Sequence, residues 1–99
     1  MDTITIQCDP DLEDLIPGYM NNRRKDITVI RECLKDDNFA QIHTLGHSMK
    51  GSGGGYGFDE ITDLGSRLEL AALASNKDEI DQVVETLEDY VNRVEVVYS

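Results

Sequence analysis

Apolar side chains recur every three or four residues in four successive stretches of this 99-residue chain, and that spacing limits the fold more than any other feature. Such spacing places apolar residues on one face of an α-helix, which is then buried against other helices. The stretches are carried by Ile27, Ile30 and Leu34; by Ile42, Leu45, Met49, Ser52 and Tyr56; by Ile61, Leu64, Leu68 and Ala71 or Ala72; and by Ile80, Val83, Val84, Leu87, Val91 and Val94. Because the connections are short, successive helices should be antiparallel. The sequence therefore predicts an all-α, up-down antiparallel four-helix bundle.

Residues with special backbone preferences mark where these helices begin and end. Asp9-Pro10 indicates a short extra N-terminal helix, because Asp can cap a helix and Pro suits its first position. Pro17-Gly18 interrupts that helix. The first bundle helix is expected from there to about Lys35, with Asp37 or Asn38 capping the next one.

The remaining boundaries follow from the same rules. The second bundle helix is expected over 39–56, with Gly57 as its stop. Asp59 opens the third, and Ser75-x-x-Asp78 resembles a capping box before the fourth. Residues 3–7 and 94–98 alternate weakly between apolar and polar, which indicates extended ends.

Length and composition limit the class of protein. Residues 1–99 are expected to form a single domain with a short N-terminal extension over 1–8. No apolar run approaches the roughly 18 residues of a membrane span, and the start of the chain lacks the features of a signal peptide, so a cytoplasmic protein is expected. With 9 basic and 20 acidic residues the net charge is −11, which argues against nucleic acid and anionic membrane as partners. Cys8 and Cys33 are too few for a disulfide scaffold and are expected to be small apolar side chains.

His47 stands apart from the apolar pattern of its own helix. At about 100° per residue, the apolar positions fall within an arc of roughly 80°, and His47 lies about 170° from the centre of that arc. Lys50, Gly51 and Gly54 lie on the side of His47, and His43 is nearby. The bare backbone would let another protein reach the imidazole. Alternatively, the helix ends at Gly51 and a flexible loop follows.

The other glycines suggest packing. Gly53 and Gly55 point away from the face of His47 and are expected to allow close contact with the next helix.

An exposed histidine followed one turn later by a lysine suits phosphoryl transfer. A neutral imidazole has a free lone pair and is a nucleophile for phosphoryl groups. Lys50 can supply a positive charge for the phosphoryl oxygens. Nothing in the sequence supplies a nucleotide site or a magnesium cluster, so a partner would have to provide the catalysis.

The run His47-Ser-Met-Lys50-Gly51, with Gly57 ten residues after the histidine, resembles the signature of histidine-containing phosphotransfer (HPt) domains. Leu64-Gly-Ser-Arg-Leu68-Glu69 resembles the next helix of that family, which commonly ends in a Leu-Glu pair. The chain departs from the family at residues 53–56, where alanines, an asparagine and a leucine are usual.

The resemblance implies a role for each matching residue. His47 would be phosphorylated on a ring nitrogen as an intermediate of a two-component phosphorelay, and Lys50 would stabilise the phosphoryl group. Gly51 and Gly54, flanked by His43, would form the surface that a partner approaches. The partners would be the receiver domain of a response regulator and a sensor or hybrid histidine kinase.

The resemblance also implies what the chain itself does not supply. The chain would be a free-standing shuttle and not an enzyme. It would bind no cofactor of its own, and Mg²⁺ would sit on the receiver domain. A monomer is expected, and the sequence leaves a dimer open.

Other interpretations fit the residues less well. His43 and His47 could hold a metal at their four-residue spacing, but no third ligand is evident, so no metal is expected. The glycine run cannot be a P-loop, because Lys50 precedes the glycines. Ser48 and Ser52 lack the setting of a nucleophile elbow. A helical docking module that binds receivers or kinases without being phosphorylated remains as the alternative function.

The basic cluster Arg23-Arg24-Lys25 stands out in an acidic chain. It is interpreted either as a docking contact for an acidic receiver face or as a solvated helix face with local ion pairs.

Overall fold

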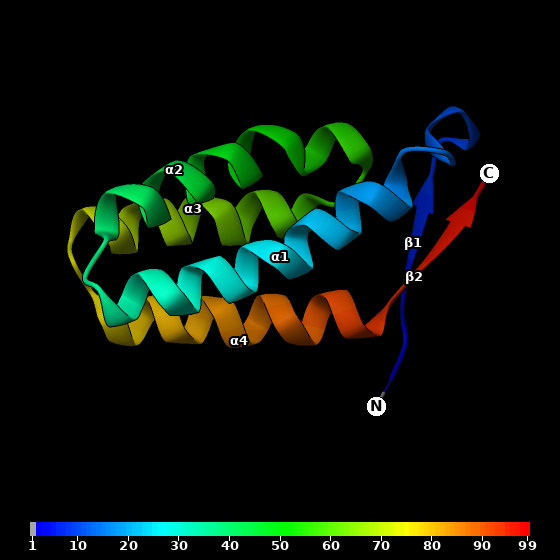
Figure 1. Cartoon of the computed structure of the whole chain (residues 1–99). Coiled ribbons are helices and arrows are strands. Elements are labelled where there is room, and N and C mark those ends of the chain that lie inside the picture. The colour runs from blue at the N-terminus through cyan, green and yellow to red at the C-terminus, as the bar shows by residue number, and fades with distance from the viewer. Residues whose placement is uncertain (1) are drawn as a thin grey trace.

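The computed structural model describes residues 2–99, which form four long helices and two short strands. The helices are α1 (Ile16–Lys35), α2 (Phe39–Ser52), α3 (Asp59–Leu73) and α4 (Lys77–Arg93). The strands are β1 (Ile4–Cys8) and β2 (Val94–Tyr98). In Figure 1 successive helices run in opposite directions along one elongated bundle, with both chain ends at the same end of it. The predicted antiparallel arrangement of four helices is therefore what the structure shows.

The predicted N-terminal helix is wrong. Only a 3₁₀ turn, Pro10–Leu12, forms there, although Asp9 does cap it by accepting a hydrogen bond from the Asp11 amide. Pro17 does not interrupt a helix but lies in the first turn of α1, where its missing N–H costs nothing. The first bundle helix therefore begins at Ile16, one residue before the predicted start, and ends at Lys35 as predicted.

The ends of the chain add a sheet that the all-α prediction lacks. β1 and β2 pair in parallel, with Ile4 beside Val94 and Cys8 beside Tyr98. The inward-facing apolar side chains of both strands pack against the helical core. The predicted extended ends are thus confirmed. Their pairing places the first and last parts of the chain side by side.

Two helix boundaries differ in detail from the prediction. α2 ends at Ser52, and residues 54–56 continue as a 3₁₀ turn that stops at Gly57, whose φ is +95°. The two predictions for this segment, one helix to residue 56 or a flexible loop after Gly51, are therefore both wrong. Before α4, Asn76 rather than Ser75 is the cap, since the Asn76 side chain accepts from the Glu79 amide while Ser75 has φ +51°. Asn38 caps α2 as predicted.

The core lies between the four helices and is apolar throughout. The side chains of Phe58, Ile30, Ile42, Leu68 and Leu87 are fully buried. Cys8 and Cys33 are buried free thiols, as expected. No helix among residues 2–99 is both long enough and apolar enough to span a membrane.

Candidate functional site

Glycines bring α2 and α3 into close contact and so build the site. A Cβ atom added at Gly46 would lie 2.7 Å from the backbone nitrogen of Glu69, and one at Gly65 would clash with the backbone nitrogen of Lys50. Side chains at either position would push the two helices apart. The helices therefore approach closely where α2 carries its exposed polar residues.

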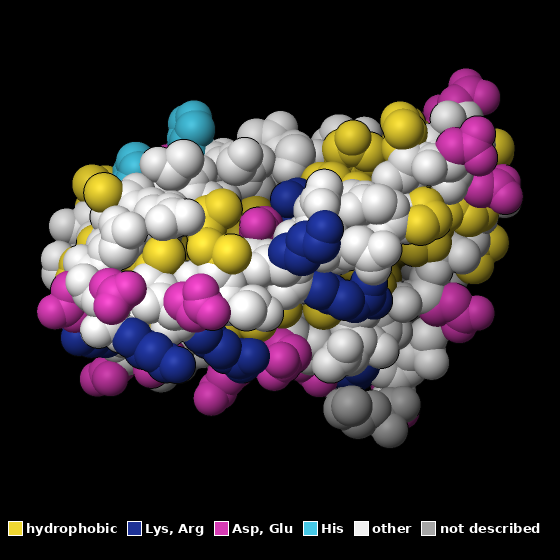
Figure 2. Space-filling view, in the orientation of Figure 1, with side chains coloured by type: hydrophobic (Ala, Val, Ile, Leu, Met, Phe, Trp, Pro, Cys, Tyr) yellow, Lys and Arg dark blue, Asp and Glu magenta, His cyan; other side chains and the backbone are white. Residues whose placement is uncertain are grey.

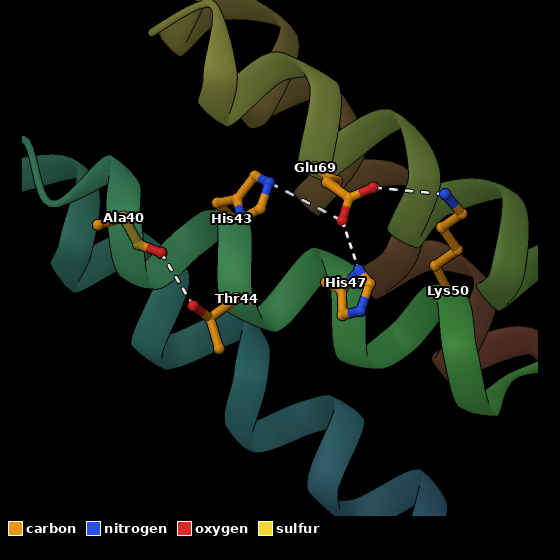
Figure 3. Close-up of polar contacts among 6 residues, drawn as sticks. All are labelled: Ala40, His43, Thr44, His47, Lys50 and Glu69. Atoms are coloured by element: carbon orange, nitrogen blue, oxygen red, sulfur yellow. Dashed lines mark hydrogen bonds and ion pairs between the residues drawn. The ribbon is translucent and has the colours of Figure 1, made fainter.

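Glu69 reaches from α3 into the group of polar residues on α2. The Nδ1 atom of His47 lies 2.7 Å from Oε2 of Glu69, and the Nζ atom of Lys50 lies 3.4 Å from Oε1. The Nε2 atom of His43 lies 3.8 Å from Oε2 of the same carboxylate. Figure 3 shows the three side chains converging on Glu69 from one face of α2. The structure thus brings together His43, His47 and Lys50, as the sequence predicts.

The carboxylate of Glu69 fixes which nitrogen of His47 carries the proton. An ionised carboxylate only accepts hydrogen bonds, so Nδ1 of His47 must donate. The pKa of Glu69 lies below its ordinary value, first because His47 donates this hydrogen bond and also because the charge of Lys50 is near. In the neutral ring, Nε2 therefore has the free lone pair. Figure 3 shows Nε2 on the side of the ring away from Glu69.

Exposure differs sharply among these side chains. His47 is 73% exposed and Lys50 49%, whereas Glu69 is only 13% exposed. Figure 2 shows both histidines at the surface of the bundle. The carboxylate is therefore the fixed part of the site, and the imidazole above it is open to another molecule.

The backbone around His47 is partly bare, as predicted. Nothing lies within 4 Å of a Cβ added at Gly51, and one at Gly54 would meet only ordinary contacts at 3.6 Å. The amide of Gly54 donates to Oγ1 of Thr62, 2.8 Å away, which holds the 3₁₀ turn after α2 against α3. Gly53 packs tightly against Phe58 and Thr62, as expected, but Gly55 faces open space and the packing expected of it is wrong.

Beside the site, an aromatic cluster fastens the end of α2 to α1. The hydroxyl of Tyr19 lies 2.9 Å from Oγ of Ser52, and its ring stacks on Tyr56 with centroids 4.2 Å apart. The guanidinium of Arg23 lies over the other side of the Tyr19 ring and pairs with Asp26 at 2.9 Å. Arg23 is thus held locally, and so is Arg24, which donates to the backbone oxygen of Val91. These contacts favour the structural interpretation of the basic cluster.

Sequence reasoning missed the partnership of Glu69 with His47. In the sequence, Glu69 stands out only as part of the Leu-Glu pair of the family resemblance, and nothing there assigns a packing role to Gly46 or Gly65. A small residue on each of two neighbouring helices was the signal, but it acquires meaning only once the helices are paired.

The chemistry open to this site is nucleophilic. An exposed imidazole nitrogen with a free lone pair stands next to a lysine, with a largely covered carboxylate behind. Within residues 2–99 no group of three His, Cys, Asp or Glu side chains has the arrangement of a metal site.

Comparison with known proteins gives one family. The family model for the Hpt domain matches residues 14–96, a range that includes all four helices. No curated protein and no solved structure matches the chain.

Proposed function

We propose that this chain, which belongs to the Hpt domain family, carries a phosphoryl group on Nε2 of His47 in a phosphorelay. Hpt domains take part in histidine phosphotransfer and interact with receiver domains and histidine kinases. The group would pass between His47 and the aspartate of a receiver domain, or from a histidine kinase through His47 to a response regulator. The observation that carries the proposal is the hydrogen bond between His47 and Glu69.

The proposed step uses the lone pair of Nε2. This lone pair attacks the phosphorus of an aspartyl phosphate on the receiver, an N–P bond forms, and the P–O bond to the aspartate breaks. The electron pair of the broken bond returns to the aspartate carboxylate. The ring becomes a phosphorylated imidazolium, whose Nδ1 proton stays hydrogen-bonded to Glu69. Transfer in the other direction reverses each change.

Glu69 supports this step without touching the phosphoryl group. Its hydrogen bond holds the ring in one tautomer and one orientation, so that Nε2 faces outward. Its negative charge stabilises the positive charge that the ring gains in the imidazolium. Only 13% of the Glu69 side chain is exposed, so its position between α2 and α3 is well defined.

Lys50 supplies the positive charge that the phosphoryl oxygens require. Its ammonium is 49% exposed and rests 3.4 Å from Glu69 on a flexible stem, so it can swing from the carboxylate to a phosphoryl group on His47. The partner contributes the rest, namely the aspartate and its Mg²⁺ or the kinase active site. Gly51 and Gly54 leave room for that partner, and the chain itself is not an enzyme in this scheme.

The test is the transfer of labelled phosphate. The protein is mixed with a phosphorylated receiver domain, and the label on the protein should be acid-labile and base-stable. His47→Gln should abolish the label, while the matched variant His43→Gln should keep it. Label that survives His47→Gln would refute the assignment of the site, and no label from any receiver or kinase would favour the docking module.

A further inference from the structure

The outer edge of β2 carries backbone groups that have no partner strand. The amide of Ser99 donates to the carbonyl of Cys8, 3.1 Å away. Because backbone groups alternate in direction along a strand, this bond orients the groups at positions 95, 97 and 99 toward β1. The groups of Val96 and Tyr98 and the carbonyl of Val94 therefore face away from β1. Between residues 2 and 99 no backbone hydrogen bond reaches these groups of Val96 and Tyr98.

The two edges of the sheet differ. The outer edge of β1 is partly covered where the strand ends, because the carbonyl oxygen of Gln7 lies 3.7 Å from where a Cβ at Gly57 would be, and the thiol of Cys8 donates to the carbonyl of Tyr56 at 3.4 Å. β2 lies at the outside of the molecule, and Figure 1 shows no helix or strand beyond it. The edge of β2 is therefore the more open of the two.

The edge of β2 has few of the features that keep strands apart. Natural edge strands are usually protected by lysine, proline, bulges or very short length. β2 reads Val-Glu-Val-Val-Tyr, with one charge, no proline and no lysine, although its five residues are few. The side chain of Val97 is also 41% exposed on the solvent side. Such an edge can accept another strand.

We propose that β2 pairs with β2 of a second copy of this chain, in an antiparallel register centred on Val96. Each Val96 amide donates to the Val96 carbonyl of the other copy. Each Tyr98 amide donates to the Val94 carbonyl of the other copy. The result is a continuous four-stranded sheet with the order β1–β2–β2–β1 around a two-fold axis.

The edge is complementary to itself in this register, which is why a second copy fits it. Positions 94, 96 and 98, whose backbone groups face the free edge, meet one another, and the apolar inner faces of the two sheets become continuous. Glu95 lies opposite Val97 of the second copy. In the alternative register centred on Glu95, the Glu95 side chains of the two copies would lie opposite each other. Like charges that face each other across a strand pair are destabilising.

The association should be weak and should depend on salt. The pairing involves two five-residue strands, which places it among small interfaces. Each chain also has a net charge of −11, and the mutual repulsion falls as salt screens it. The dimer is therefore expected at high protein concentration and high ionic strength, in place of the monomer that the sequence suggests.

Sedimentation equilibrium of the full chain, up to about 1 mM protein and at low and high salt, tests the proposal. Val96→Pro removes the N–H that faces the free edge and leaves the bonds to β1 intact, since proline is tolerated at strand edges. Val96→Ala keeps that N–H and is the matched control. The wild type and Val96→Ala should dimerise, and Val96→Pro should weaken association by at least about tenfold. A wild type that is monomeric throughout, or equal association of the two variants, overturns the proposal.

Amide hydrogen exchange tests the same edge without a substitution. The amides of Val96 and Tyr98 should exchange more slowly as the protein concentration rises, whereas the amide of Val97, already bonded to β1, should change little. Unchanged exchange at Val96 and Tyr98 overturns the proposal. So does a dimer that is lost with Leu73→Glu but kept in Val96→Pro, because Leu73 on α3 is 69% exposed and belongs to a different surface.

Discussion

The Nδ1 atom of His47 lies 2.7 Å from Oε2 of Glu69, although 22 residues separate them in the chain. The two side chains meet because Gly46 and Gly65 let α2 and α3 approach closely. The side chain of His47 is 73% exposed and that of Glu69 13%, so a largely covered carboxylate orients an accessible imidazole.

Replacing Glu69 should slow phosphoryl transfer without removing the acceptor. Glu69→Ala deletes the group that fixes the tautomer of His47, and loss of such an orienting partner of a histidine typically costs about 10- to 100-fold. Glu69→Gln should cost less, because its amide oxygen can still accept from Nδ1 but has no charge. The measurement is the rate of transfer from a phosphorylated receiver.

Two controls separate orientation from folding. Glu79→Ala removes an exposed carboxylate that pairs with Arg67 and should leave the rate unchanged. The ¹⁵N chemical shifts of the His47 ring should show less of the tautomer with hydrogen on Nδ1 in Glu69→Ala. An unchanged tautomer and an unchanged rate would remove Glu69 from the mechanism.

Lys50→Ala should affect the phosphorylated protein more than the fold. Its ion pair with Glu69 is half exposed, so the loss of unfolding free energy should stay within about 1 kcal/mol. Without the ammonium, the phosphoryl oxygens lose their positive partner, and transfer should slow or the lifetime of the phosphohistidine should shorten. Thermal unfolding and the decay of label on His47 measure the two effects. Equal rates and lifetimes in both proteins would contradict the role given to Lys50.

The sequence predicted the exposed residues of the site on α2 better than the contact between α2 and α3 that positions them, for a physical reason. Helical periodicity depends only on local geometry, so it placed His47, Lys50 and Gly51 on one outer face and the core residues on the other. The contact between Gly46 and Gly65 depends on how two helices cross, which local periodicity does not contain. The pairing of β1 with β2 joins segments about ninety residues apart, and neither strand shows in its own sequence that the other lies beside it.

Gly65→Ala should disturb the crossing of α2 and α3. Its new methyl group would clash with the backbone nitrogen of Lys50, which cannot turn aside as a side chain could. Overpacking of this kind costs about 1–3 kcal/mol, and the displaced helices should also weaken the bond between Glu69 and His47. Gly51→Ala is the matched control, because its methyl group enters open space and favours the helix by up to about 1 kcal/mol. In chemical denaturation, Gly65→Ala should lower the free energy of unfolding and Gly51→Ala should raise it. Equal changes in the two variants would contradict the packing argument.

Gly51→Arg should hinder partners while the protein stays folded. The position lies on the face of His47 with nothing within 4 Å, so a long side chain fits the isolated protein but occupies the space that a receiver needs. Transfer between His47 and a receiver should fall, while the melting temperature should be unchanged or higher, because arginine favours a helix more than glycine does. Gln82→Arg adds the same charge on the exposed side of α4 and should transfer normally. If both variants transfer equally well, the partner approaches from elsewhere.

Tyr90→Phe should leave the protein at least as stable as before near neutral pH. The side chain of Tyr90 is 4% exposed, and its hydroxyl has no hydrogen-bond partner among residues 2–99. Removing a buried unpaired hydroxyl avoids its desolvation cost, so unfolding free energy should be unchanged or higher by about 1 kcal/mol.

The pH dependence of this difference has a definite sign. Burial, followed by the nearby charge of Glu60, raises the pKa of Tyr90 to about 12 in the folded protein. The unfolded chain ionises near pH 10, so the stability that comes from keeping this phenol neutral is present below pH 10 and is lost as the pH rises toward 12. Tyr90→Phe should lack this loss, and its advantage over the wild type should grow between those pH values. If Tyr90→Phe instead destabilises the protein at pH 7, the hydroxyl has a partner such as a buried water, and the argument from an unpaired group fails.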